Sequence, residues 1–172
     1  WQRMELLEWN FDETSLYLAV AHSICEYSVQ RHIFEITSGY PIITYFLAEH
    51  YKQYGNINIE TPIADLNQYY EELLLNVDTK SSLCTFATSN SFFTREELTT
   101  FFADPETYDI LNEFVSAYPY LFVILQNRIS LIHDSFNTYL RGILNSFPRR
   151  QESVLNVVKS SLIAGNIEYM AR

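Results

Sequence analysis

The segment 120–144 limits what this chain can fold into more than any other, because it has the pattern of strand, turn, strand and helix. Residues 120–125 are aromatic, β-branched or otherwise apolar, and residues 128–132 alternate between polar and apolar, as in a half-buried strand. Gln126 and Asn127 separate the two runs, and Asn tolerates the positive φ of a tight turn. The segment therefore predicts a β-hairpin that leads directly into a helix.

The predicted helix follows His133, at the end of the second strand. Its apolar residues recur at helical spacing: Phe136, Tyr139, Leu140, Ile143 and Leu144. We expect Asp134 or Ser135 to cap this helix by accepting hydrogen bonds from its first N–H groups. His133 would then lie at the junction of hairpin and helix, which makes it the first candidate for a functional side chain.

The composition restricts the classes of function. A chain of 172 residues with 48% hydrophobic and 16% aromatic content can bury the cores of one or two small domains. Its net charge of −10 disfavours a nucleic-acid partner, because phosphate binding needs clustered Lys and Arg. Without a signal peptide or an apolar run long enough to span a bilayer, we expect a cytoplasmic protein with no membrane partner. Cys25 and Cys84 are predicted to be buried free thiols.

Residues 11–55 are predicted to form a small helical bundle. Asp12 is the expected N-cap of the first helix, and the expected buried stripe of that helix is Leu16, Ala19 and Val20. A second helix over residues 27–38 would end at Gly39, in the left-handed conformation. Pro41 would begin a third helix, because its missing N–H costs nothing there, and Gly55 would end it.

Residues 62–146 predict helices followed by the hairpin and its helix, which is the order of a winged helix. Four helices are expected before the hairpin. The first begins at Pro62 and the second near residue 81, the third follows a capping box at Thr94, and the fourth begins at Pro105. Residues 149–172 resemble the start of a helical array. The predicted fold is therefore mainly α: a small helical bundle, then a winged-helix domain with one short β-hairpin, then the start of a helical array. Since the chain begins without Met and stops within a helical pattern, we interpret it as a fragment of a larger protein.

A winged helix first suggests DNA binding, but the charge of the predicted recognition helix opposes it. That helix, residues 106–116, carries Glu106, Asp109 and Glu113 and no Lys or Arg. An acidic helix would meet like charge in the major groove. We therefore expect contacts with protein and no nucleic-acid partner.

No catalytic or metal site is predicted. The four glycines form neither a phosphate-binding P-loop nor a GxGxxG motif, and the four histidines and two cysteines lack zinc-site spacing. His133 and Asp134 are adjacent on a turn and diverge, so a catalytic pair is not expected. Taken alone, the sequence from Gly39 to Pro41 is explained by one helix ending and the next beginning.

In combination, three segments resemble the lid and winged-helix region of STAND nucleotide-switch ATPases, the group with NB-ARC and NACHT members. Residues 4–13 resemble the last strand of the ATPase core and its exit into the first lid helix. Residues 36–42 resemble the GxP motif, with Gly39 and Pro41 in its fixed positions. Residues 128–141 resemble the segment that carries the MHD-type histidine, here His133.

The resemblance implies a function as a nucleotide switch. Pro41, with Gly39, would lie near the nucleotide base, and His133 would contact the β-phosphate of ADP and hold the off state. Mg²⁺ would be held by a P-loop core that this chain lacks, so the chain alone would bind no ADP or ATP and would not be an enzyme. Its partners would be the ATPase core of the same parent and, on activation, further copies of the parent.

The resemblance also implies a division of the chain and a biological setting. Residues 1–10 would be a remnant of the core, residues 11–55 the helical lid, residues 62–146 the winged helix, and residues 149–172 the start of a sensor array. The setting would be bacterial immunity of the anti-phage type, or signalling. The alternative is a non-catalytic helical adaptor whose acidic, Tyr-rich faces bind another protein.

Overall fold

The chain is mainly helical, with a small antiparallel sheet. The computed structural model describes residues 7–57, 59–75, 83–84, 93–94, 98, 105–126, 128–144, 146 and 152. The chain divides into two compact units, Trp1–Leu75 and Asn76–Arg172. Within the described ranges, no helix has both the length and the apolar character needed to cross a bilayer. Most of residues 1–10, the expected remnant of the ATPase core, and most of the predicted array over residues 149–172 lie outside these ranges.

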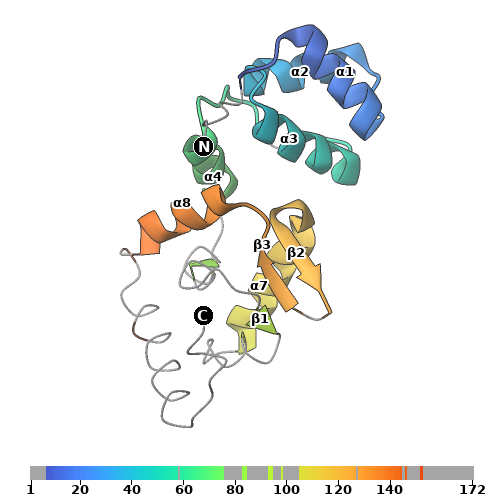
Figure 1. The fold of residues 1–172 in the computed structure, drawn as a ribbon. Coiled ribbons are helices and arrows are strands. Elements are labelled where there is room, and N and C mark those ends of the chain that lie inside the picture. Colours follow the sequence, from blue (N-terminus) through green and yellow to red (C-terminus); the bar gives the residue numbers. More distant parts are fainter. Residues whose placement is uncertain are drawn as a thin grey trace, which may run out of the picture. The chain divides into compact units, whose positions relative to one another are not determined.

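Three helices of the first unit lie side by side (Figure 1). They are α1 (Phe11–His22), α2 (Tyr27–Thr37) and α3 (Pro41–Tyr54). Their main buried side chains are Leu18, Ile33, Ile36, Ile43, Phe46 and Leu47. The helical bundle predicted from the sequence is therefore present.

The N-cap of α1 is Asn10, so the prediction of Asp12 was wrong. The Glu13 N–H donates to Oδ1 of Asn10 across 3.0 Å, and the Asn10 N–H donates to Oε2 of Glu13 across 2.9 Å. These two bonds form a reciprocal capping box, which satisfies two backbone donors at the start of the helix.

The buried face of α1 also differs from the prediction. Leu16 and Val20 are 66% and 77% exposed, and Ala19 is half-buried. The helix instead buries Thr14, Leu18 and His22, which are four residues apart. Because two of these three side chains are polar, the apolar periodicity of the sequence pointed to the wrong face.

The turns that separate the helices were predicted correctly. Ser38 and Gly39, at the end of α2, have φ of 49° and 77°, and Gly55, at the end of α3, has φ of 71°. Pro41 is the first residue of α3. Left-handed residues of this kind let a helix end sharply, and glycine adopts them at least cost.

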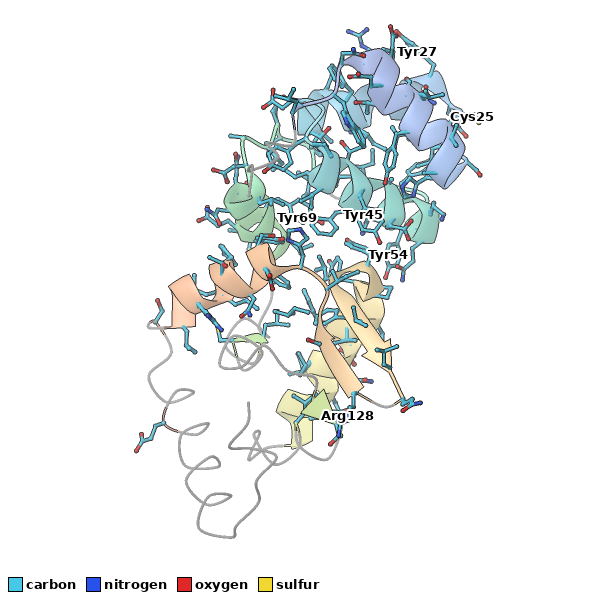
Figure 2. All side chains as sticks on the ribbon, viewed as in Figure 1. Cys25, Tyr27, Tyr45, Tyr54, Tyr69 and Arg128 are labelled. Carbon is cyan, nitrogen blue, oxygen red and sulfur yellow. The ribbon has the colours of Figure 1, made fainter. Side chains whose placement is uncertain are left out.

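The next helix, α4 (Leu66–Leu73), belongs to the first unit. It begins four residues after the predicted start at Pro62, because the side chain of Asp65 accepts a hydrogen bond from the Gln68 N–H across 2.9 Å. Tyr69, labelled in Figure 2, stacks on Phe46 of α3 with ring centroids 5.3 Å apart.

The second unit contains a three-stranded antiparallel sheet in the order β1-β3-β2. Its elements are β1 (Phe93–Thr94), α7 (Pro105–Ala117), a 3-10 turn η2 (Pro119–Leu121), β2 (Phe122–Leu125), β3 (Arg128–Leu131) and α8 (Asp134–Leu144). The strands β2 and β3 form the predicted hairpin, with Phe122 opposite Leu131 and Leu125 opposite Arg128.

Two details of the sheet differ from the prediction. The first hairpin strand begins at Phe122 and not at Tyr120, because Pro119 opens a 3-10 turn. Strand β1 was not predicted, and Thr94, the expected helix cap, pairs with Arg128 within it. Residues 95–97 lie outside the described ranges, so the proposed capping box after Thr94 stays a prediction.

Helix α7 buries four side chains at helical spacing: Tyr108, Leu111, Phe114 and Val115. The thiol of Cys84 is buried, as expected, and lies 3.7 Å from the carbonyl oxygen of Leu140. Cys25 is exposed. The prediction that both cysteines are buried therefore holds for Cys84 and is wrong for Cys25.

Candidate functional site

His133 lies between β3 and α8, at the junction predicted from the sequence. Its carbonyl oxygen accepts hydrogen bonds from the N–H groups of Phe136 and Asn137, at 3.1 and 3.4 Å. Since α8 begins at Asp134, these bonds make His133 the N-cap residue of the helix.

The side chain of His133 performs the capping that we assigned to Asp134 or Ser135. Its Nδ1 accepts the backbone N–H of Ser135 across 3.2 Å, and the Ser135 hydroxyl lies 2.6 Å from the same nitrogen. An imidazole nitrogen here takes the place of the Ser, Asp or Asn oxygen that usually accepts this bond. The prediction of Asp134 or Ser135 as cap was therefore wrong.

This contact also fixes where the proton of a neutral His133 ring resides. A backbone N–H can only donate, so Nδ1 must be the unprotonated nitrogen. The neutral imidazole then carries its hydrogen on Nε2 and presents a hydrogen-bond donor at that atom. His133 is half-buried.

Gly39 lies in the turn between α2 and α3, where the incoming chain crosses it. The Trp9 N–H donates to the carbonyl oxygen of Gly39 across 2.9 Å. A Cβ added to Gly39 would lie 1.8 Å from the carbonyl oxygen of Trp9, which is far inside van der Waals contact. Glycine is therefore required here for space as well as for its φ of 77°.

Pro41 and its neighbours complete the turn. Pro41 is buried at the start of α3, and Tyr40 and Ile42 on either side are half-buried. The Gly39 N–H donates to Oγ1 of Thr37 across 3.2 Å. This turn is thus held by backbone and side-chain bonds from α2 and from the segment before α1.

Two of the three predicted site residues come together in one turn. Gly39 and Pro41 belong to the first unit, whereas His133 belongs to the second. A common nucleotide site for all three residues therefore stays a prediction.

The first unit contains a polar cluster around the buried His22 that was not predicted from the sequence, and we call it the His22 cluster (Tyr17, His22 and Glu49). Nε2 of His22 lies 3.0 Å from the Tyr17 hydroxyl, and Nδ1 lies 2.9 Å from Oε1 of Glu49. Nζ of Lys52 lies 3.5 Å from the same carboxylate oxygen. The His22 side chain is only 4% exposed.

Burial dominates the electrostatics of the His22 cluster. It lowers the pKa of His22, although the Glu49 carboxylate opposes this shift. Burial also raises the pKa of Tyr17, and the charge of Glu49 adds to the rise. Nδ1 of His22 makes no well-aligned hydrogen bond despite its short distance to Glu49. The His22 ring at the end of α1 thus faces the Glu49 carboxylate of α3.

A shallow hollow of about 290 Å³ opens on the surface of the first unit. Its lining residues are Ser28, Val29, His32, Tyr51 and Ile57. Neither a nucleophile with a matched base nor a set of metal ligands is present in this lining. Across the described parts of the chain, no group of three or more His, Cys, Asp or Glu side chains could hold a metal ion.

The described geometry contains two well-defined features: an imidazole that caps α8 and a glycine turn clamped by Trp9. No protein-family model, curated protein or solved structure matches this chain. The family resemblance accordingly stays a hypothesis.

Proposed function

We propose that this chain is the lid and winged-helix portion of a STAND nucleotide-switch ATPase and holds ADP in the off state. The observation that carries the proposal is the capping contact of His133. Because Nδ1 accepts the Ser135 N–H, the neutral ring has its donor at Nε2. A donor of fixed position at the end of a hairpin is what a diphosphate latch requires.

The energy of such a contact suits a switch. A hydrogen bond from Nε2–H of His133 to a diphosphate oxygen is charge-assisted and contributes roughly 1.5–3 kcal/mol. If the contact forms only with ADP, it shifts the equilibrium between off and on states by no more than that amount. This is enough to hold a domain closed, and it does not hydrolyse the nucleotide.

The second unit supports the winged-helix part of the proposal. Helix α7 precedes the hairpin of β2 and β3, and α8 follows it, which is a winged-helix order. Asp109 and Glu113 on α7 are exposed, so this helix is better suited to protein than to the phosphates of DNA. The proposed partners are the P-loop core of the same parent and, on activation, other copies of that parent.

The nucleotide and its metal come from outside this chain in this proposal. A P-loop core would hold the phosphates and Mg²⁺, while the turn at Gly39 and Pro41 would lie near the base. The proposed setting is the bacterial cytoplasm, in immunity or signalling. A reading frame that encodes a P-loop lysine motif before Trp1 would support this organisation.

The experiment compares substitutions at His133 in the intact parent protein. His133→Ala removes both the helix cap and the Nε2 donor, whereas His133→Asn keeps a good N-cap and removes the imidazole. We expect both variants to lose ADP during purification and to signal without an activator. Ser135→Ala keeps the ring and the backbone N–H that fixes it, so it should retain ADP.

Two outcomes would decide against the latch. Full ADP occupancy and normal signalling in His133→Asn would show that the imidazole is dispensable. Loss of ADP in His133→Ala alone, with retention in His133→Asn, would assign the effect to helix capping and not to a phosphate contact.

A second candidate function is a helical adaptor that binds another protein. It is favoured by the exposed apolar side chains of Leu16 and Val20 on α1, since clustered apolar exposure often marks an interaction site. An initiating Met directly before Trp1 in the gene would favour the adaptor. Replacing both residues with Ser should then abolish partner binding and leave the helical content unchanged.

A further inference from the structure

The sheet of the second unit has one face that points away from α7. Phe122 of β2 points toward α7, since its ring meets that of Phe114 with centroids 6.2 Å apart. Side chains alternate between the two faces along a strand, so Leu125 lies on the face that α7 does not cover. Arg128, its cross-strand partner in β3, lies on the same face. We call Leu125 and Arg128 the hairpin patch.

The hairpin patch combines an apolar side chain with a cation. Leu125 is 56% exposed, and Arg128, labelled in Figure 2, is exposed beside it. Arg128 forms no ion pair with any described residue, because the ion pairs that join two described side chains all lie in the first unit. The patch therefore presents a positive charge and an apolar surface that the described part of the chain does not use.

The exposed face of α7 has the opposite charge. Asp109 and Glu113 are both exposed, and residues four apart lie one above the other on a helix, so the two carboxylates repel each other. Neither forms an ion pair with a described cation. Ile110, which is 36% exposed, lies three residues before Glu113 and is its neighbour on the helix surface. We call Asp109, Ile110 and Glu113 the helix patch.

The two patches lie on opposite sides of the second unit. The helix patch is on the side of α7 opposite to the buried side chains of that helix, and the hairpin patch is on the face of the sheet that points away from α7. Within one copy, the helix and the sheet therefore separate Arg128 from both carboxylates. Only another molecule can bring the two patches together.

We propose that the hairpin patch of one copy binds the helix patch of a second copy. Arg128 then pairs with the two carboxylates of α7, and Leu125 packs against Ile110. Each patch has an apolar side chain beside its charge, so the two match in charge and in apolar contact. Because the patches differ, the contact is heterologous, and every copy keeps one unused patch through which a ring or a filament can grow. This inference goes further than the proposed function, because it names the faces that meet and requires no nucleotide.

The first test measures self-association of the complete chain without nucleotide. Sedimentation velocity at low salt should show masses above the 20.2 kDa of one copy, and their share should rise with protein concentration. Added salt should reduce it, because ions screen the charges at an exposed contact. A reducing agent is present throughout, since the exposed Cys25 could otherwise link two copies. A chain that stays monomeric at every concentration would overturn the proposal.

Charge reversal identifies the two patches. Arg128→Glu should raise the dissociation constant by about tenfold, because attraction becomes repulsion. Asp109→Lys combined with Glu113→Lys should do the same from the other side. An equimolar mixture of these two variants should associate as the wild type does, because each offers the other the complementary charge. Arg31→Glu is the matched control, since it changes the net charge equally at an exposed arginine of the first unit.

Two results with the variants would also overturn the proposal. Equal weakening by Arg128→Glu and Arg31→Glu would assign the effect to net charge, and a mixture that associates no better than its components would separate the two patches. If Arg128→Glu fails to fold by circular dichroism, Arg128→Gln takes its place. A monomeric chain would leave ADP retention through His133 untouched, so this inference and the proposed latch can be rejected separately.

Discussion

The backbone of Trp9 crosses Gly39 closely enough that the Trp9 N–H donates to the Gly39 carbonyl across 2.9 Å. The same crossing leaves only 1.8 Å between the Trp9 carbonyl oxygen and a Cβ built on Gly39. The glycine of the GxP-like segment thus has a local structural role, which it would retain even if no nucleotide ever approached the turn.

Replacing Gly39 with Ala should destabilise the first unit strongly. The new Cβ adds a backbone clash to an unfavourable positive φ, and we expect a loss of about 3 kcal/mol. Gly55→Ala is the matched control, because its φ of 71° is similar and nothing lies within 4 Å of its Cβ. It should cost only about 1 kcal/mol. Urea unfolding followed by Trp9 fluorescence in a Trp1→Phe background measures both, and equal losses would contradict the clamp.

The orientation of α1 can be tested with two leucines of the same helix. Leu18 is 0% exposed and Leu16 is 66% exposed. Leu18→Ala should therefore cost about 2–5 kcal/mol of unfolding free energy, whereas Leu16→Ala should change it by less than about 0.5 kcal/mol. Thermal or urea unfolding of the two variants gives the comparison. A larger loss at Leu16 would restore the orientation that we predicted from apolar spacing.

Acidification should weaken the first unit through His50. Burial lowers the pKa of His50, and a hydrogen bond with Asn56 only partly opposes this. The unfolded chain then binds the proton more readily than the folded chain does. The stabilisation is complete above the unfolded pKa and is lost as pH falls below it, with a slope of at most about 1.4 kcal/mol per pH unit.

The variant His50→Gln should flatten this loss of stability on the acid side of neutrality. Unfolding free energies measured at a series of pH values for the wild type and the variant give the difference directly. His32→Gln, at an exposed position, serves as the control. Parallel curves for the wild type and His50→Gln would show that His50 does not contribute.

The helix cap at His133 can be tested without nucleotide. His133→Ala should lower the stability of the second unit by about 1 kcal/mol, because the Ser135 N–H loses its acceptor. His133→Asn supplies a preferred capping side chain and should recover most of that loss. Amide exchange at Ser135 reports the cap directly. Unchanged protection in His133→Ala would rule out the capping role.

Much of the architecture could be predicted because Gly, Pro and Asn signals have local causes. Gly39 and Pro41 mark one helix end and the next helix start, and Gly55 marks another end. The hairpin was recognisable from a change to two-residue alternation after Gln126. A positive φ was expected to suit the Asn of this turn, and Gln126 adopts one, with φ of 47°. These signals act within a few residues, so a single sequence is enough to interpret them.

Features that depend on contacts between distant residues could not be predicted. The buried face of α1 includes polar His22, whose partner Glu49 lies on another helix, so apolar spacing favoured Leu16 and Val20 instead. Strand β1 has only two residues and forms through pairing with β3. The sequence located the candidate His133 correctly but did not reveal that its ring would cap the helix.

The buried junction between α3 and α4 determines how far the first unit can be shortened. Ile63 is buried and its N–H donates to the Ile36 carbonyl across 2.8 Å, and Tyr69 stacks on Phe46. A stop codon placed after Gly55 would expose Phe46 and leave the Ile36 carbonyl without this donor. Recombinant versions of the unit should consequently extend to Leu75.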